Sequence, residues 1–399
     1  MHFKTYNIGL SQLTILAFFI ILPFEMVNHS IVYSLMELFF VFSAIRCYQQ
    51  FGNVIKDPFF KCYLLVIVWC LIVTLLSPIY KQSLKSSTQW FLPLLMIFPL
   101  YTEGNLRAIL RRYLWIPTII VFIQSIVLFI YFKFGIDAIE KYTWLSMLYY
   151  LNWEWTGKVY SSTLSLCFIV LIYACIDNKF QRNILCLLNI VSGFLSCDRA
   201  FFFSLLILVM LAIYLRNRDR ISKLIKISIV LVALFTIILS FLVVEYFLKI
   251  DLHVSQRFAV YTYWLPKLLI SPIHGVGVGI PSLQYYLQLY PVPQNLLAID
   301  IGMKTHAHNI LLDVALTQGF VGAIIFISIF IYLVSVTLKN KQNPLCNSFI
   351  YMVTVIFSKF MVDDRFEAHM MIVFWFFLLS AYVLSIDKKF KYNQCLNKI

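Results

Sequence analysis

Apolar runs, each close to the length needed to cross a bilayer, follow one another along most of this sequence. A transmembrane helix needs ~20 apolar residues, because the hydrocarbon core is ~30 Å thick and a helix rises 1.5 Å per residue. Hydrophobic residues make up 61% of the 399 residues and charged residues 13%. Soluble domains carry ~25% charged residues. The sequence therefore predicts an all-α polytopic membrane protein and excludes an ordinary soluble domain.

Twelve runs are interpreted as helices. We expect them at residues 8–26, 30–46, 62–80, 88–101, 113–132, 159–176, 182–196, 200–215, 224–247, 308–338, 346–361 and 369–386. The chain then divides into nine transmembrane helices over 1–247, a polar segment over 248–307, and three helices with a tail over 308–399. No small-residue cleavage site follows the first apolar run, which predicts a retained helix and not a removed signal peptide.

The distribution of basic residues predicts the orientation. If the N-terminus is cytoplasmic, most of the 32 lysines and arginines fall on the inner side, and the outer side is close to neutral. This is the positive-inside pattern. It places three polar stretches on the outer side: residues 196–199, 248–307 and 359–368. The net charge of +14 then indicates topology and contact with anionic lipids, and a nucleic acid partner is not needed.

Cysteine spacing and loop composition argue against several cofactors. The nine cysteines are scattered, mostly within apolar runs, without a Cys-x-x-Cys spacing, so we interpret them as small core residues. A Walker-type phosphate loop is absent from the sequence. The sequence therefore predicts neither a metal site nor nucleotide hydrolysis.

Residues 306–322 read HAHNILLDVALTQGFVG and form the most informative stretch. At 100° per residue, one stripe of a helix here contains His308, Leu312, Ala315, Gly319 and Gly322. Small residues on one stripe let a neighbouring helix approach closely. We expect a continuous, tightly packed helix with His308 where the membrane meets water.

The polar residues at the start of this helix have two interpretations. A lone histidine at a helix end ordinarily makes a local hydrogen bond, but its pKa near ambient pH also suits His308 to be a general base. His306 and His308 lack a third convergent ligand, which argues against a metal site. Asn309 is a residue type favoured at helix caps, and we also assign it, with His306, to substrate contact.

Two arginines stand at outer boundaries. Arg199 ends the Ser-Cys-Asp-Arg tip of a tight hairpin, and Arg257 follows Ser-Gln at the start of an aromatic-rich stretch. In one interpretation Arg199 reaches towards water and pairs with Asp198, and Arg257 is a solvated loop residue. In the other, each guanidinium presents a fork of donors to an anionic group.

Two further stretches are candidates for substrate contact. The alternating glycines over 275–279 permit turns and a close approach of backbone to a ligand at Gly277 and Gly279. The run lacks the strand–helix context of a dinucleotide site. Asp363 and Arg365 belong to a charged connection that is either a solvated turn or the lining of a polar acceptor groove.

The pair His308-Asn309, followed after nine residues by Gly319-x-x-Gly322, resembles the signature of bacterial O-antigen ligases. The resemblance extends over roughly residues 159–386 and includes the two arginines, Pro272 and the Gly-x-Gly run. In many relatives a tryptophan stands four residues after the second arginine, where this chain has Tyr261.

This resemblance implies a C-type glycosyltransferase fold of about twelve transmembrane helices in the bacterial inner membrane, with a large periplasmic segment and a periplasmic active site. It implies a glycan donor on undecaprenyl diphosphate and a lipid A–core sugar hydroxyl as acceptor. Arg199 and Arg257 would bind the diphosphate, and His308, or failing it His306, would take the acceptor proton. Neither metal nor nucleotide would be consumed, and membrane lipids would be the surrounding partner.

Three alternatives stay open. An O-antigen polymerase would use the same donor with a second lipid-linked glycan as acceptor. A protein O-oligosaccharyltransferase would modify pilin-like proteins and often carries additional soluble segments. A transporter or lipid flippase would place ionisable groups at the bilayer midplane within repeated halves, whereas this chain has its polar groups at one surface and no repeat.

Overall fold

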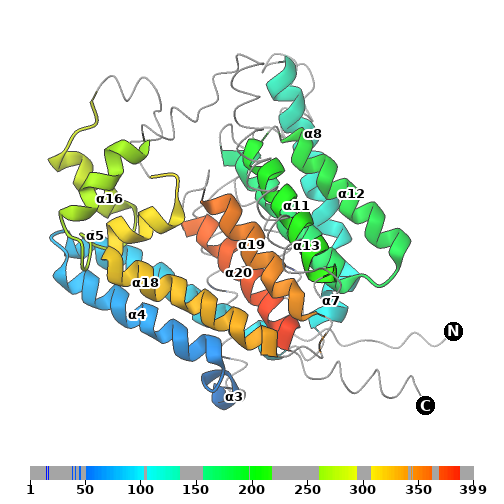
Figure 1. Cartoon of the computed structure of the whole chain (residues 1–399), viewed down its shortest axis with the longest axis horizontal. Coiled ribbons are helices and arrows are strands. Elements are labelled where there is room, and N and C mark those ends of the chain that lie inside the picture. Colours follow the sequence, from blue (N-terminus) through cyan, green and yellow to red (C-terminus); the bar gives the residue numbers. More distant parts are fainter. Residues whose placement is uncertain are drawn as a thin grey trace.

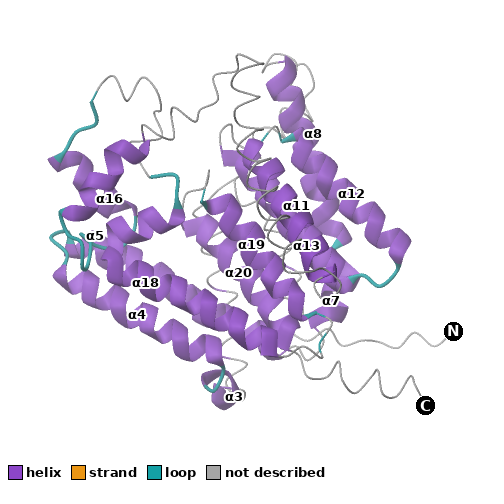
Figure 2. Cartoon of the chain, viewed as in Figure 1, coloured by secondary structure: helices purple, strands orange, loops and turns teal. Residues whose placement is uncertain are grey.

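The computed structural model describes residues 51–102, 106–134, 156–196, 198–217, 260–293, 307–339, 343, 345–361 and 368–386, with positions 15, 17, 38, 41 and 45. Every regular element in these ranges is helical (Figure 2). The helices expected at 8–26, 30–46 and 224–247 lie almost entirely outside the described residues.

Most expected helices within the described ranges are confirmed, with ends shifted by at most four residues. They are α4 (Pro58–Leu76), α11 (Thr156–Cys175), α12 (Lys179–Leu195), α13 (Arg199–Asn217), α19 (Cys346–Phe360) and α20 (Ala368–Ile386). Local capping explains the early start of α4, because the Asp57 carboxylate accepts from the Phe59 N–H at 2.7 Å and Pro58 needs no acceptor at the first turn.

One expected helix is divided. The run 88–101 becomes a 3₁₀ turn, η3 (Thr88–Phe91), followed by α6 (Leu92–Thr102). The helix expected at 113–132 is confirmed as α8 (Trp115–Phe134), with its ends shifted by two residues. A short basic helix that was not expected, α7 (Leu106–Tyr113), precedes α8 and meets it at 43°.

Besides α7, four short elements were not expected. They are α3 (Phe51–Ile55), α5 (Tyr80–Ser87), η4 (Leu265–Leu269) and α16 (Ile280–Leu289). The last two lie in the polar segment 248–307. Short polar helices of this kind are marginal alone and depend on tertiary packing, here of α5 on α4 and α16.

The apolar helices are compatible with a membrane protein. Among the described residues, α4 and α18 (Ile310–Lys339) are long and apolar enough to cross a bilayer, and α7 with α8 would make a third span. Shorter apolar helices occur at Val159–Cys175, Ala200–Arg216, Cys346–Phe360 and Met370–Ile386. The expected number of twelve spans stays a prediction.

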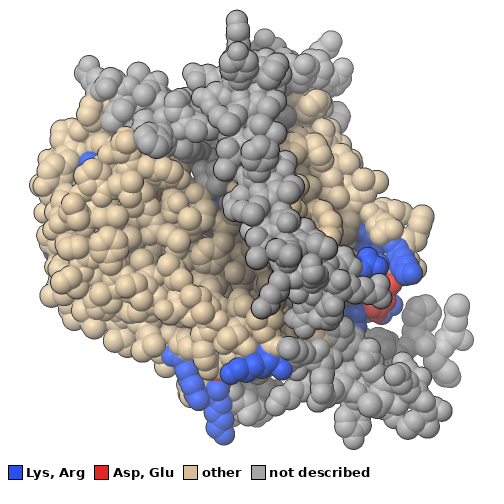
Figure 3. Space-filling model, viewed as in Figure 1, with Lys and Arg blue, Asp and Glu red and all other residues tan. Residues whose placement is uncertain are grey.

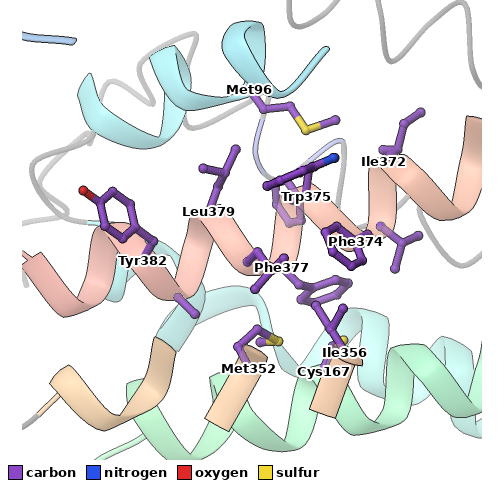
Figure 4. Packing of buried hydrophobic residues seen from close by; sticks show 14 of the residues in the cluster. Met96, Cys167, Met352, Ile356, Ile372, Phe374, Trp375, Phe377, Leu379 and Tyr382 are labelled. Carbon is purple, nitrogen blue, oxygen red and sulfur yellow. The ribbon is translucent and has the colours of Figure 1, made fainter. Parts of the chain in front are cut away.

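The described helices form two groups around a central pair. Figure 1 shows α4, α5, α16 and α18 on one side, α8, α11, α12 and α13 on the other, and α19 with α20 between them. Helix α20 is buried on nearly every face, with Phe374, Trp375 and Phe377 at most 1% exposed. Figure 4 shows side chains of α6, α11 and α19 surrounding it. A helix that is apolar all round belongs at the centre of such a bundle.

Charged atoms gather at one end of the visible surface. Figure 3 shows blue lysine and arginine atoms mainly along the lower edge and lower right, with a largely uncharged surface between and above them. Exposed basic residues that the sequence assigns to the inner side are Lys56, Lys61, Arg111, Arg112, Lys179, Arg216 and Lys339, whereas Lys81 and Lys85, which it assigns to the outer side, are exposed as well. The orientation expected from the positive-inside pattern stays a prediction.

Candidate functional site

Helix α18 breaks at Gly319, where φ is 71° and ψ is 179°. This backbone conformation is essentially restricted to glycine. The expectation of one continuous stripe from His308 to Gly322 is therefore wrong, because the turn changes direction at Gly319. Residues 320–339 alone rise about 30 Å, enough for a bilayer. The preceding helical segment, residues 310–318, is therefore not needed to span the membrane. It begins two residues after His308 and fixes the position of that residue just before the start of α18.

The 271–279 loop fills the break in α18. The Phe320 N–H donates to the Pro272 carbonyl at 2.7 Å, and the Gly277 N–H donates to the Thr317 carbonyl at 3.1 Å. The Trp69 indole N–H donates to the Gln318 carbonyl at 2.9 Å. Backbone groups that the break removes from the helix are thereby satisfied, as burial requires.

Glycines make this close approach possible. A Cβ on Gly319 would lie 2.1 Å from the Ile273 carbonyl oxygen, and a Cβ on Gly275 would lie 2.3 Å from the Thr317 carbonyl oxygen. The expected small-residue packing at Gly319 is thus against a loop. Gly322 does face a neighbouring helix, because a Cβ there would lie 2.9 Å from Trp69 Nε1 on α4. Ala315 is buried, 7% exposed.

The other glycines of the run approach serines. A Cβ on Gly277 would meet Ser77 Oγ at 2.5 Å, and one on Gly279 would meet Ser86. Ser77 Oγ donates to the Val276 carbonyl at 2.7 Å, and the Val278 N–H donates to Ser83 Oγ at 2.8 Å. The close approach expected from these glycines is therefore to the protein itself. Substrate contact at Gly277 and Gly279 stays a prediction.

His308 lies just before α18 in a left-handed conformation, with φ at 54°. Asn309 caps the helix as expected: its Oδ1 accepts from the N–H groups of Leu311 and Leu312, each at 3.0 Å. Asp313 reaches back past the histidine and accepts from the Ala307 N–H at 2.8 Å. These two contacts hold the chain on both sides of His308, whose side chain is buried at 8% exposure. His308 is therefore largely shielded from water, and its expected position where the membrane meets water stays a prediction.

A small core packs the 260–292 segment against the first turns of α18. It contains Val260, Tyr263, Trp264, Val276, Leu283, Tyr286, Ala307, Leu312 and Leu316. Within it, the Tyr286 hydroxyl donates to the Leu316 carbonyl at 3.3 Å. This packing covers the chain around His308.

Lys267 forms a cationic contact in the same segment. Its Nζ lies 3.2 Å from the centroid of the Tyr263 ring and donates to the Tyr263 carbonyl at 2.7 Å. Burial lowers the pKa of Lys267 to about 8 and raises that of Tyr263 to about 12. The ring face and the carbonyl favour the ammonium form, so they act against the effect of burial.

A buried ion pair joins the start of α13 to the end of α19. Asp198 precedes Arg199, the first residue of α13, and its carboxylate binds the Lys359 ammonium and the Ser162 hydroxyl. It also accepts from the Ala200 N–H at 3.1 Å, as a cap. The side chain of Lys359 is 0% exposed and that of Asp198 is 1% exposed. Asp198 thus has a described cationic partner other than Arg199.

The Met361 carbonyl joins two further candidate segments. Asn309 Nδ2 donates to it at 3.3 Å, and the Tyr261 hydroxyl donates to it at 3.4 Å. Asn309 adjoins His308, and Tyr261 lies four residues after Arg257. Met361 also lies two residues after Lys359. The end of α19 therefore connects the chain segments that carry Arg199, Arg257 and His308.

Several candidate residues are outside this description. Arg257, His306, Asp363 and Arg365 lie outside the described residues, and the side chain of Arg199 is not described. Their roles remain predictions. Within the described ranges, no group of three or more His, Cys, Asp or Glu residues has the arrangement of a metal site.

The sequence pattern missed the importance of Lys359 and Asp313. The sequence contained one indication of each. Lys359 is the single charged residue in the run 346–361, and Asp313 is the single charged residue in the first turns of the run 308–338. Ionisable groups in apolar runs are functional or structural anchors. Their partners, Asp198 and the Ala307 N–H, are visible only in the folded chain.

Together these contacts fix a buried, neutralised ion pair next to Arg199 and hold the backbone on both sides of His308. A histidine held in place in this way can take up a proton.

The comparisons with known proteins agree with this arrangement. A family model described as O-antigen ligase matches residues 184–327, which include Arg199, Arg257, His308, Gly319 and Gly322. No curated protein matches the chain. The match supports the resemblance of this chain to the O-antigen ligase family over residues 184–327.

Proposed function

We propose that this protein is a glycosyltransferase of the bacterial inner membrane that acts as an O-antigen ligase on the periplasmic face. The observation that carries the proposal is the junction at the end of α19, where segments next to Arg199, Arg257 and His308 meet through Lys359 and Met361. The match to the O-antigen ligase family supports the reaction class.

The donor is a glycan linked to undecaprenyl diphosphate. Arg199 and Arg257 bind the diphosphate, for which the guanidinium fork is well shaped. As the bond between the anomeric carbon and the diphosphate oxygen breaks, the electron pair stays on the departing diphosphate. Fixed positive charge in a site that excludes water stabilises this developing charge by several kcal/mol.

The acceptor is a sugar hydroxyl of lipid A–core. Its oxygen attacks the anomeric carbon, and its proton passes to the imidazole of His308, which later releases it to water. General base catalysis of this kind contributes roughly 10²–10⁴-fold. Asn309 and Asp313 support the role of His308, because they hold the backbone on either side of it. His306 is the second candidate for the base.

The reaction needs no nucleotide or metal, because the diphosphate is itself the leaving group. Six further residues are assigned to substrate contact, as secondary candidates beside the three catalytic residues: His306, Asn309, Gly277, Gly279, Asp363 and Arg365. A polymerase of O-antigen repeats differs only in the acceptor, a second lipid-linked glycan, and a protein O-oligosaccharyltransferase differs in using a protein acceptor.

A lipopolysaccharide gel from the host with this gene disrupted tests the proposal, together with an assay of lipid-linked glycan. A ligase predicts loss of every O-antigen band from lipid A–core while long lipid-linked chains persist. Core that carries a single repeat indicates a polymerase. An unchanged ladder contradicts both.

Complementation with variants then tests the residues. His308→Ala and Arg257→Ala should abolish transfer at an unchanged level of membrane-inserted protein, and Arg199→Lys should retain part of it, because the charge remains without the fork. His306→Ala is the comparison variant. If H306A loses transfer and H308A keeps it, the general base is His306 and not His308. Near-normal transfer in both H308A and R257A contradicts the assignment.

A further inference from the structure

Helix capping does not explain why residue 198 is charged. The Asp198 carboxylate accepts from the Ala200 N–H at the start of α13, but asparagine or serine caps a helix as well as aspartate. A neutral residue would also avoid the cost of burying a carboxylate, whose side chain is 1% exposed here. The charge therefore requires another partner.

Lys359 supplies the opposite charge from α19. The lysine is 0% exposed and sits among the apolar side chains of a 15-residue helix. A buried ion pair contributes little net stability, since two apolar residues of similar size would pack as well or better. Stability alone therefore gives a weak reason for this pair.

The neighbour of Asp198 gives a stronger reason. Asp198 directly precedes Arg199, and an acidic group beside an arginine competes with any anion for the guanidinium. In this structure Lys359 and Ser162 bind one carboxylate oxygen, and the Ala200 N–H binds the other. Both oxygens are thereby engaged by groups other than Arg199.

We propose that Lys359 is a positioning residue that neutralises Asp198 and so leaves the charge of Arg199 available to an anionic diphosphate. This inference rests on the proposed function, in which Arg199 binds the donor. Lys359 lies outside the range matched by the O-antigen ligase family, residues 184–327. The charge balance at the start of α13 thus depends on a helix outside that range.

The proposal predicts opposite effects from two substitutions that break the same pair. Lys359→Met leaves Asp198 free to bind Arg199, so diphosphate affinity should fall by about tenfold. Asp198→Asn removes the competing negative charge and keeps a cap, so affinity should be unchanged or higher. The double variant D198N/K359M should return to within about twofold of wild type.

Binding of undecaprenyl diphosphate to purified protein in lipid nanodiscs measures these effects per folded molecule. Asp177→Asn is the matched control, because it removes an acid from an exposed ion pair with Arg107 and Arg111, and it should leave affinity unchanged. Lys359→Gln takes the place of K359M if that variant does not yield folded protein.

The result that overturns the proposal is a fall of affinity in both K359M and D198N, which indicates a purely structural pair, or no fall in K359M. Arg199→Ala separates this failure from that of the proposed function. If R199A loses affinity and K359M does not, only the role of Lys359 fails. If R199A binds as wild type, the donor role of Arg199 fails, and the proposal falls with it.

Discussion

The break in α18 and the start of α13 are both held by buried polar contacts, but the contacts differ in kind. At Gly319 the partners are neutral backbone groups, the indole of Trp69 and a loop of glycines. At Asp198 they are a carboxylate and an ammonium on separate helices. The first junction depends on shape, because backbones pass within contact distance. The second depends on charge balance, because neither ion is exposed.

This difference determines how each region should respond to substitution. Added volume is the main hazard where glycines let backbones meet, whereas removal of one partner is the main hazard at a buried ion pair. Both junctions hold chain segments of the candidate site, so a substitution at either one would change activity by displacing the residues of that site. The following predictions test the comparison through the free energy of unfolding.

The largest effect is expected for Gly319→Ala. Its φ of 71° and ψ of 179° disfavour any side chain, and the new Cβ would lie 2.1 Å from the Ile273 carbonyl oxygen. Strain and backbone displacement together should cost about 4 kcal/mol. Thermal unfolding of detergent-solubilised protein measures the loss. Gly52→Ala is the control, because nothing lies within 4 Å of its added Cβ; equal melting temperatures in the two variants would contradict the shape-dependent junction.

Lys359→Met should come next, at about 3 kcal/mol, because the carboxylate of Asp198 then lacks its cationic partner in a buried site. The double variant D198N/K359M should recover most of this stability, since neither charge is left. Thermal unfolding of K359M, D198N and the double variant beside wild type gives the coupling energy between the two side chains. If the double variant is as unstable as the sum of both single variants, charge balance is not what holds this junction.

Trp69→Phe should cost about 1 kcal/mol, because the Gln318 carbonyl loses one neutral hydrogen bond. Trp115→Phe is the control, since its side chain is 46% exposed. The melting temperature of each variant is the measurement. A loss in W69F as large as that in K359M would mean that the neutral junction is no more tolerant than the ionic one.

Asp177→Asn should have the smallest effect, about 0.5 kcal/mol or less, because its ion pairs with Arg107 and Arg111 are exposed to solvent. The difference in melting temperature from wild type should shrink further in 1 M salt, which screens exposed charges but not buried ones. A salt-independent loss comparable to that in K359M would remove the distinction between exposed and buried pairs.

Local patterns were sufficient for one part of the candidate site. Asn309 follows His308 and precedes an apolar run, which predicted a cap, and its Oδ1 accepts from two N–H groups of the first turn. The same reasoning failed at Gly319, because helical periodicity assumes that the helix continues. Whether a glycine within an apolar run bends the chain depends on what packs against it, here the 271–279 loop.

Long-range contacts explain what could not be predicted. The Lys359–Asp198 pair joins residues 161 positions apart, and the Trp69–Gln318 hydrogen bond joins residues 249 positions apart. A lone lysine in an apolar run indicated that a partner was needed, but several acids were available along the chain. The packing of Ala307 and Leu312 on either side of His308 likewise depends on distant residues, which lie in the 260–292 segment.

The sequence by itself determined the helical class, most helix positions, the cap at Asn309 and the O-antigen ligase signature, because these depend on residues close together along the chain. The tertiary structure alone decided the break at Gly319, the pairing of Lys359 with Asp198 and the meeting of segments at Met361. Those features depend on which surfaces come into contact, and the energy of a buried charge or of a freed carbonyl is set by that contact.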